Sequence, residues 1–296
     1  MTTDNLFILA VDQRPWLLNA LFGHAGEASP DERSLTTEAK HLVLDGLLRA
    51  VAESVPRGGA ILVDPELGPG VPERAKARGV RLALPIERAG LRVYETEPKD
   101  LGGYLRHYAP EFSKVLVRYN PADDPEERAL QRSRLAEASH VSRQAGTRFL
   151  FELLVPPTAE QLAEVDGDEE RFDHELRPEL TRQAMREILE EVGVDLWKLE
   201  HQGDLESSRR TVELARQHGG ECIILGAGAD EETVRRWLAI AAEAGYSGFA
   251  IGRSIWWKSV QQLVADPADD DVRTAACAAI ARTYTEFAEA FVDAQS

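Results

Sequence analysis

The sequence has little of what metal sites and disulfide frameworks require. Only two of its 296 residues are cysteines, Cys222 and Cys277, and their separation argues against a disulfide framework or a cysteine-based metal site. The seven histidines show neither HxH nor HExxH spacing, which disfavours a metal-dependent aldolase or hydrolase. No GxSxG or GxxxxGKS/T motif occurs, which counts against a serine hydrolase and a P-loop kinase.

Long apolar runs and an excess of positive charge are also missing. Runs such as LFILAV are far shorter than the roughly 18 residues of a membrane span, and the start MTTDNL carries an acid instead of the basic residues of an export signal. The 34 Lys and Arg against 51 Asp and Glu give a net charge of −17, which repels nucleic acids and anionic membranes. We therefore expect a cytoplasmic protein with no nucleic-acid or membrane partner. An anionic ligand needs a local cationic site.

Eight short apolar runs alternate with longer amphipathic stretches along the chain. The predicted strands cover 6–12, 59–64, 80–87, 114–119, 148–155, 194–200, 221–226 and 248–252. The clearest helical patterns cover 125–145, 178–192, 206–218 and 230–244. Strands that are apolar on both faces and are each followed by a helix are typical of a (β/α)8 TIM barrel. We expect an α/β fold with a single barrel domain over residues 1–296; a doubly wound open sheet is the alternative.

Two acidic stretches interrupt this pattern. Residues 164–175, EVDGDEERFDHE, are predicted to form a solvated loop after the fifth strand. Residues 266–271 are predicted to form a turn before an extra C-terminal helix at 272–292. Neither stretch has the composition of a linker, so neither divides the chain into domains.

Lysine is scarce, since only six occur and arginine carries most of the positive charge. Two of the six, Lys114 and Lys198, lie in predicted strands, and alternation places Lys198 on the same face as Leu196 and Glu200. An amine that attacks a ketone needs a lowered pKa, because an ordinary lysine, with a pKa near 10.4, is almost entirely protonated at pH 7. Burial and a second nearby cation lower such a pKa. Lys198 is therefore a candidate Schiff-base lysine with Lys114 as the second cation; a structural ion pair is the other interpretation.

Carboxylates occur where a barrel collects its chemistry. Glu152 lies in the middle of FLFELLV, where an unpaired charge is costly to bury, so it needs a cation or a proton. Beside a Schiff-base lysine it can shuttle protons, whereas a salt bridge to Lys114 or Lys198 would leave it no catalytic task. Asp12 and Asp64 end the first two predicted strands, at the end of a barrel that carries active sites. We expect Asp12 to orient the substrate and Asp64 to cap a turn.

The last two predicted strands end in glycine-rich segments, GAGAD at 226–230 and GRSIW at 252–256. Barrels commonly present backbone N–H groups to phosphate in these loops, and an arginine adds a bidentate cation. Loops without a ligand are the alternative, and GAG lacks the third glycine of a dinucleotide fingerprint. The residues expected to bind substrate or phosphate are Arg253, Gly226, Gly228, Gly252, Ser254, Gln13 and Arg14.

The segments FILAVDQR, ILVDPELG, KVLVRYN, FLFELLV, DLWKLEHQ and GFAIGRSIW follow one another over roughly residues 5–265. With this order and spacing, the sequence resembles the class I aldolases of the tagatose bisphosphate aldolase type. It is still more similar to the aldolase-like domain fused to 5-dehydro-2-deoxygluconokinase. The resemblance implies a (β/α)8 barrel with the Schiff-base lysine at Lys198, the acid/base glutamate at Glu152 and an accessory lysine at Lys114.

The same resemblance implies the first-strand aspartate at Asp12 and the phosphate-binding arginine at Arg253. The chain combines a VDPELG segment like the tagatose type with a WKLEHQ segment like the fused type. Tagatose-type enzymes release dihydroxyacetone phosphate and an aldehyde, the fused domain implies 2-deoxy-5-keto-gluconate 6-phosphate as substrate, and related enzymes act on sulfofructose phosphate.

The expected activity is therefore that of a metal-independent class I aldolase with no cofactor. It would cleave a phosphorylated keto sugar or keto-sugar acid and release dihydroxyacetone phosphate. The expected partner is a small-molecule sugar phosphate, and assembly into a homo-oligomer is left open. One alternative is a sugar-phosphate-binding barrel without turnover that acts as a sensor or partner subunit, and another is an isomerase or decarboxylase on the same barrel.

Overall fold

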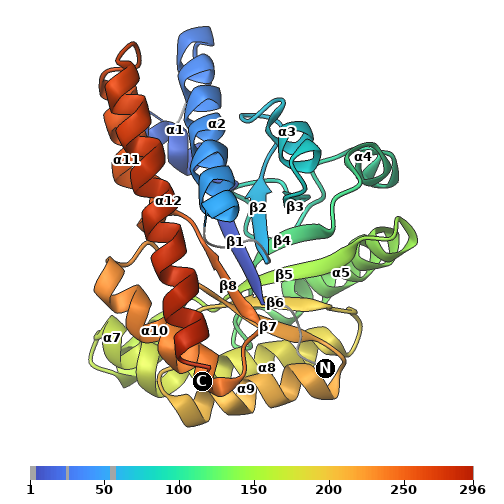
Figure 1. The fold of residues 1–296 in the computed structure, drawn as a ribbon. Helices are drawn as coiled ribbons and strands as arrows, with labels where there is room; N and C mark the ends of the chain where they lie inside the picture. Colours follow the sequence, from blue (N-terminus) through green and yellow to red (C-terminus); the bar gives the residue numbers. More distant parts are fainter. Residues whose placement is uncertain (1–4, 25–26, 54–57, 296) are drawn as a thin grey trace.

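The computed structural model describes residues 5–24, 27–53 and 58–295. Eight parallel strands form a closed barrel in the order β1 to β8, and helices surround it (Figure 1). This architecture confirms the predicted (β/α)8 barrel and excludes the open, doubly wound sheet. Residues 1–4, which contributed to the expectation that no export signal is present, lie outside the described residues.

The strands lie close to the predicted apolar runs. They are β1 (Leu6–Val11), β2 (Gly59–Val63), β3 (Arg81–Pro85), β4 (Phe112–Arg118), β5 (Arg148–Leu154), β6 (Leu196–Leu199), β7 (Glu221–Leu225) and β8 (Gly248–Ile251). Neighbouring strands pair in parallel all the way round, and β1 pairs with both β2 and β8. Since β1 ends at Val11, Asp12 is the first residue after it.

Helices follow every strand. They are α1 (Pro15–Phe22), α2 (Pro30–Glu53), α3 (Val71–Ala77), α4 (Leu101–Tyr108), α5 (Pro125–Gln144), α6 (Ala159–Glu164), α7 (Glu169–Arg171), the π-helix η1 (Phe172–Leu176), α8 (Arg177–Leu189), α9 (Leu205–Gln217), α10 (Glu231–Ala244), α11 (Arg253–Ala265) and α12 (Asp270–Asp293). Aspartate caps start several of them; for example, Asp124 accepts hydrogen bonds from the first N–H groups of α5. None of these described helices is long and apolar enough to cross a membrane.

The prediction of a solvated loop at 164–175 is wrong. After α6 ends, the carboxylate of Asp168 caps α7, and η1 follows and leads directly into α8. Phe172 is fully buried, with the guanidinium of Arg177 5.4 Å from its ring centroid. A buried aromatic ring, the buried side chain of Val165 and an N-cap give this acidic segment its structure, and a prediction based on its charge gave them too little weight.

The C-terminal helix covers the first and last strands. In the described chain, α12 packs against α2, α10 and α11, and Figure 1 shows it crossing the outside of the barrel. The hydroxyl of Tyr284 donates a hydrogen bond to the carbonyl oxygen of Phe7 at 2.7 Å, and the ring of Phe7 stacks on Phe249. The helix begins at Asp270, two residues before the predicted start, because Asp269 caps it. α12 therefore contributes to the core over β1 and β8.

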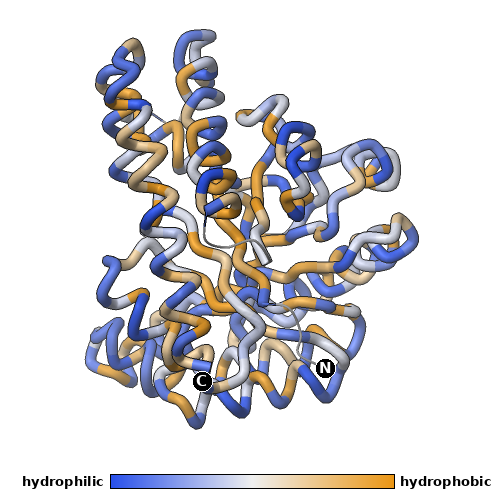
Figure 2. The backbone as a smooth tube through the Cα atoms, viewed as in Figure 1, coloured by the Kyte–Doolittle hydropathy of each residue, from blue (hydrophilic) through white to orange (hydrophobic). Residues whose placement is uncertain are grey.

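The barrel interior is apolar at one end and polar at the other. Its apolar part consists of Leu6, Ile8, Ala10, Ala60, Leu62, Ala83, Phe112, Leu150, Leu196, Ile223 and Ala250. The outward faces of the strands pack against the helices, and the central strands are largely apolar in Figure 2. Side chains alternate along a strand, so residues two positions apart share a face. Counting two positions on from interior residues of this apolar part gives Asp12, Lys114, Glu152 and Lys198, which therefore also face the interior. A polar layer thus lies above the apolar one at the carboxyl ends of the strands.

Candidate functional site

Four of the expected site residues meet inside the barrel. Asp12 follows β1, Lys114 lies in β4, Glu152 in β5 and Lys198 in β6. Their exposed fractions are 8%, 1%, 7% and 4%, so all four are buried. Glu152 and Lys198 are register partners on neighbouring strands, and the side chain of Lys198 points to the barrel interior and not to the helices.

The carboxylate of Glu152 bridges the two lysines. Its Oε1 lies 2.8 Å from Nζ of Lys198, and its Oε2 lies 2.9 Å from Nζ of Lys114. Burial alone would raise the pKa of Glu152, but the charges of Lys114 and Lys198 outweigh burial and lower it. Glu152 is therefore an ionised carboxylate in direct hydrogen-bonding reach of the Lys198 amine, the arrangement needed for proton transfer between the two.

Lys114 is the centre of the cluster. Its Nζ also lies 2.7 Å from Oδ2 of Asp12 and 3.0 Å from Oε1 of Glu87. Burial would lower the pKa of Lys114, but the three carboxylates around it raise the pKa well above its ordinary value. Burial likewise opposes ionisation of Asp12, yet Lys114, Lys198 and Arg14 lower the pKa of Asp12 to about 2. Lys114 thus carries a permanent positive charge that holds three acids in place.

Sequence reasoning did not select Glu87, which the structure places in the same cluster. Glu87 comes two residues after β3 and is 7% exposed. Nη2 of Arg14 lies 3.5 Å from its Oε1 and donates a hydrogen bond to its carbonyl oxygen at 2.9 Å. Glu87 ends the apolar run VRLALPIE, so the rule that selected Asp12, an acid at the carboxyl end of a barrel strand, was sufficient to find it.

The end of β1 is held from two sides, which positions Asp12. Nζ of Lys40, in α2, donates hydrogen bonds to the carbonyl oxygens of Val11 at 2.8 Å and Gln13 at 3.2 Å, on either side of Asp12. The indole N–H of Trp256, in α11, donates to the carbonyl oxygen of Ala10 at 2.8 Å. These contacts fix the backbone from which the Asp12 side chain reaches Lys114.

Asp64, by contrast, makes contacts that stabilise the fold. Its carboxylate forms an ion pair with Lys40 and accepts a hydrogen bond from the backbone N–H of Leu67 at 2.8 Å. The second contact is the turn cap that we expected for this residue.

Five of the residues expected to bind substrate or phosphate lie at the ends of β7 and β8, whereas Gln13 and Arg14 follow β1. Arg253 begins α11, its Nη2 donates a hydrogen bond to the carbonyl oxygen of Ala227 at 2.8 Å, and its guanidinium lies 4.7 Å from the ring centroid of Trp16. Burial lowers the pKa of Arg253. The hydroxyl of Ser254 donates to the carbonyl oxygen of Ala229 at 2.7 Å. The first turn of α11 also presents N–H groups without an intrahelical acceptor, as every helix does.

Glycine is required here by close contacts. Gly228 has a φ of +80°, and a Cβ atom there would lie 2.7 Å from Cζ of Arg253. A Cβ atom on Gly252 would lie 2.4 Å from the carbonyl oxygen of Ala10, and one on Gly226 would lie 3.0 Å from Cγ2 of Ile251. The glycines therefore allow these loops to approach Arg253 and the neighbouring strands.

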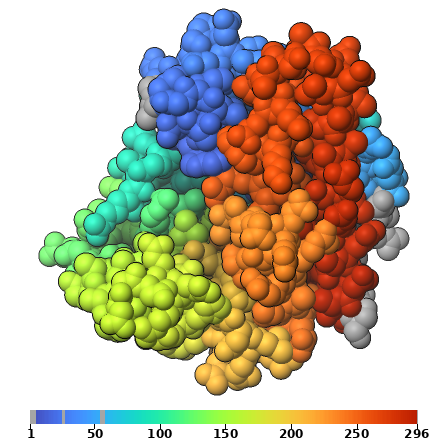
Figure 3. Space-filling view, turned by 90° about the vertical axis from the view of Figure 1, so that its left-hand side faces the viewer, coloured from blue at the N-terminus to red at the C-terminus, as the bar shows by residue number. Residues whose placement is uncertain are grey.

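A cavity of about 250 Å³ opens above the cluster. Asp12, Lys114, Glu152, Lys198 and Glu87 all line it. Gln13, Arg14 and Trp16 form part of the same wall. Figure 3 views the molecule from the side where α1 (blue), the α6–η1 segment (yellow-green) and α10 and α11 (orange) come together.

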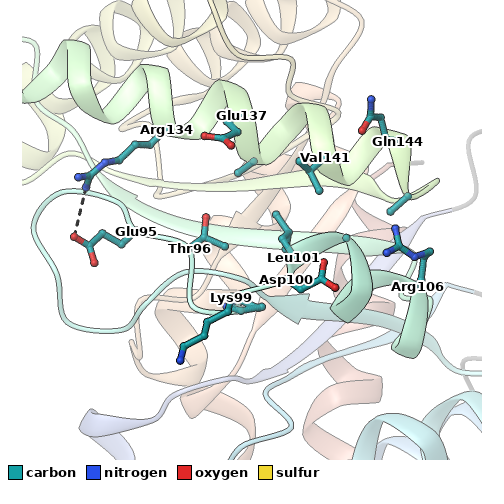
Figure 4. Close-up of a pocket in the computed structure, with 14 residues that line it drawn as sticks. Glu95, Thr96, Lys99, Asp100, Leu101, Arg106, Arg134, Glu137, Val141 and Gln144 are labelled. Atoms are coloured by element: carbon teal, nitrogen blue, oxygen red, sulfur yellow. Dashed lines mark ion pairs between the residues drawn. The ribbon is translucent and has the colours of Figure 1, made fainter.

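A larger cavity of about 590 Å³ lies outside the barrel, between α5 and the segment that leads into α4 (Figure 4). Its charged groups include Arg134 and Glu95, which are 3.6 Å apart, while Lys99 points away from α5. None of the clustered lysines or acids of the barrel lines it. The smaller cavity is therefore the candidate active site.

The described ranges hold no group of three or more His, Cys, Asp or Glu side chains arranged for a metal ion. The three clustered carboxylates instead surround the ammonium group of Lys114. Cys222 and Cys277 are free thiols.

Known structures with a similar fold include several aldolases. A fructose-bisphosphate aldolase from Plasmodium falciparum superposes with a TM-score of 0.69 at 13% identity, over 98% of this chain and 91% of that one. An archaeal fructose-1,6-bisphosphate aldolase, with its catalytic lysine bound to the carbinolamine intermediate, has a TM-score of 0.58 at 16% identity, over 95% and 94%. The protein Cgl0159 from Corynebacterium glutamicum has a TM-score of 0.56 at 18% identity, over 94% and 85%.

At these low identities the superpositions show similarity of fold alone. The family assignment comes from the sequence, because residues 1–295 match a family model described as an uncharacterized protein conserved in bacteria. The chain therefore belongs to this bacterial family, DUF2090.

Proposed function

We propose that this protein is a class I aldolase in which Lys198 forms a Schiff base with the keto group of a phosphorylated keto sugar or keto-sugar acid. The observation that carries the proposal is the 2.8 Å contact between Lys198 and Glu152 inside the barrel, at a cavity that Asp12 and Lys114 also line. The similarity of fold to aldolases, one of them trapped as a carbinolamine on its lysine, supports the same chemistry.

In this mechanism Glu152 moves the protons and Lys198 forms the bonds. Lys198 passes a proton to Glu152 and attacks the keto carbon, and the alkoxide formed takes a second proton from the attacking nitrogen to give a carbinolamine. The carbinolamine hydroxyl group then takes the first proton back from Glu152 and leaves as water. The hydroxyl group on the second carbon from the resulting protonated imine then loses its proton to Glu152. The carbon–carbon bond between that carbon and the imine's neighbour breaks, and its electron pair moves into the imine. An aldehyde leaves, and an enamine remains on Lys198.

The other cluster residues hold this arrangement. Asp12 orients the substrate hydroxyl groups, and the permanent charge on Lys114 keeps Glu152 and Asp12 ionised and in position. Arg253 and the loops with Gly226, Gly228, Gly252 and Ser254 bind the phosphate. The enamine carbon then takes the proton held by Glu152, and water hydrolyses the resulting imine, which releases dihydroxyacetone phosphate from Lys198. The tagatose bisphosphate aldolase type and the fused aldolase-like domain stay predictions from the sequence, with a ketose bisphosphate or 2-deoxy-5-keto-gluconate 6-phosphate as the substrates they imply.

Trapping the imine tests this proposal. Incubation with dihydroxyacetone phosphate and borohydride is expected to add the reduced ligand to Lys198, as read by peptide mass spectrometry. The variant Lys198→Met should give no adduct, and Lys99→Met, which changes an exposed lysine outside the barrel, should give the wild-type amount. Absence of an adduct from the wild-type protein at saturating ligand contradicts the proposal. Thermal stabilisation by the ligand without adduct or product would instead support a sugar-phosphate-binding barrel without turnover.

Loss of the Arg253 guanidinium is expected to weaken phosphate binding. Because a hydrogen bond to a charged group contributes about 1.5–3 kcal/mol, Arg253→Met should raise the dissociation constant of inorganic phosphate by about tenfold or more. Calorimetric titration measures this. Arg88→Met is the matched control, since Arg88 follows β3, not β7 or β8, and pairs with Glu95 and Glu97. If phosphate binding weakens equally in both variants, Arg253 has no specific role in binding phosphate.

A further inference from the structure

One wall of the active-site cavity contains polar atoms with no partner. Oε2 of Glu87, Nε of Arg14 and Oε1 of Gln13 are buried, and none has a hydrogen-bond partner among the described residues. All three residues line the cavity, and Glu87 and Arg14 are 7% and 9% exposed. A buried polar atom left unpaired costs about 1–3 kcal/mol, so three on one wall indicate that something else completes them.

The two carboxyl oxygens of Glu87 have different surroundings. Its Oε1 contacts Lys114 at 3.0 Å and Arg14 at 3.5 Å, whereas its Oε2 contacts neither. Glu152 differs, because each of its oxygens contacts a lysine. Burial raises the pKa of Glu87 despite the nearby charges of Lys114 and Arg14, so this oxygen is able to carry a proton as well as accept one.

The position of Glu87 determines which part of a substrate it meets. The ion pairs run from Lys198 through Glu152 and Lys114 to Glu87, so Glu87 lies at the far end of the cluster from the proposed Schiff base. Arg253 follows β8, on the side of the barrel away from β3. With the phosphate at Arg253 and the keto carbon at Lys198, the rest of the substrate extends towards Glu87.

We infer that Glu87, with Arg14 and Gln13, forms a subsite for the hydroxyl groups of the aldehyde-forming half of the substrate. A hydroxyl group both donates and accepts, so a chain of neighbouring hydroxyl groups matches a wall that offers Oε2, Nε and Oε1 together. The inference rests on the proposed function for the orientation of the substrate. It assigns a polyhydroxylated chain as the chemical class that the cavity accepts beyond the bond that breaks.

A long and a short ligand without a keto group test the subsite. Glycerol 3-phosphate is long enough only for the half next to Lys198, whereas glucitol 6-phosphate extends beyond it, and neither forms a Schiff base. In the wild-type protein, glucitol 6-phosphate should bind about tenfold or more tightly than glycerol 3-phosphate in calorimetric titrations, as expected when hydrogen bonds complete buried polar groups. Equal affinities would overturn the inference without any variant.

Two substitutions of Glu87 separate a direct contact from an effect through Lys114. Glu87→Ala should abolish most of the preference for the long ligand, while Glu87→Gln, whose amide still reaches a hydroxyl group, should keep it within about threefold of the wild-type value. If both variants lose the preference equally, or if both ligands weaken equally, Glu87 acts only as a counter-charge and the inference fails. Borohydride trapping tests the proposed function separately. A preference for the long ligand without an adduct at Lys198 would support the subsite and contradict the aldolase activity.

Discussion

Replacement of Lys114 by methionine is expected to destabilise the protein by about 3–5 kcal/mol at pH 7, the range found when one partner of a buried ion pair is removed. Methionine occupies a similar volume without charge, so it leaves Asp12, Glu87 and Glu152 around a site that no longer holds a cation. Urea unfolding followed by circular dichroism measures the loss. Lys258→Met, at an exposed lysine of α11, is the control and should change stability by less than about 0.5 kcal/mol.

The loss caused by Lys114→Met should depend on pH in a defined direction. Asp12 has a pKa of about 2 in the folded protein against an ordinary value of 3.8, and the pKa of Glu152 is lowered too. Acids with lowered pKa values contribute stability above their ordinary pKa, and the contribution disappears as the pH falls through the folded value. The difference in the free energy of unfolding between wild type and variant should therefore be largest near neutral pH and should decrease as the pH falls from about 4 to about 2.

The contribution of Glu87 to stability has the opposite pH dependence, since burial raises the pKa of Glu87. Its contribution to stability is complete below its ordinary pKa of 4.5 and declines as the pH rises through the folded value, so it does not reverse the narrowing below pH 4. A loss below about 1 kcal/mol, or a loss that stays constant from pH 7 to pH 3, would mean that Lys114 does not hold these acids together.

Glu152→Gln is expected to slow formation of the imine at Lys198 by about 100- to 10,000-fold, the range for removal of a general acid or base. Glutamine keeps the shape of the side chain, but its single amide oxygen can accept from only one of the two lysines. It also cannot take a proton from the Lys198 ammonium or return one to the carbinolamine hydroxyl. The rate is measured by quenching with borohydride at a series of times after addition of dihydroxyacetone phosphate. An unchanged thermal melting curve would show that the effect arises in the chemistry.

Glu200→Gln provides a matched control for this experiment. Glu200 follows β6 directly, and its Oε2 accepts a hydrogen bond from the backbone N–H of Val155 at 3.1 Å. Since the side-chain contacts of Glu200 are with Val155 and Arg177 and not with Lys198, its replacement should change the trapping rate by less than about threefold. If Glu152→Gln is trapped at the wild-type rate, Glu152 does not transfer the proton. Its role would then be the purely structural salt bridge that is the alternative interpretation of the sequence.

Much of the fold could be predicted because its signals are local. Short continuous apolar runs predicted all eight strands, and the alternation of Leu196, Trp197 and Lys198 is enough to decide which of these three residues share a face. The failure at 164–175 has the opposite cause. Phe172 is one apolar residue among many acids, and its burial depends on helices that only the folded chain brings next to it.

The clustering of charges depends on contacts that no local pattern contains. Lys114 meets Asp12 across 102 positions of the chain, and it does so because the barrel closes by pairing β1 with β8. Position at a strand end indicated that Asp12 belongs near the active end of a barrel, but not that Lys114 would bind it. Glu87 was within reach of the strand-end rule that selected Asp12, but its contacts with Lys114 and Arg14 came only from the structure.

The sequence by itself predicted eight strands and which residues of the sixth strand share a face, because strand periodicity and apolar content act over a few neighbouring residues. It favoured a barrel, and the closed sheet of the structure excluded the open alternative. Only the tertiary structure decided that Lys114 sits among three carboxylates, that Glu152 bridges two amines, and that α12 covers β1 and β8. These features arise from barrel closure, which brings together side chains far apart in the sequence, and burial then makes each charge depend on the partners that closure supplies.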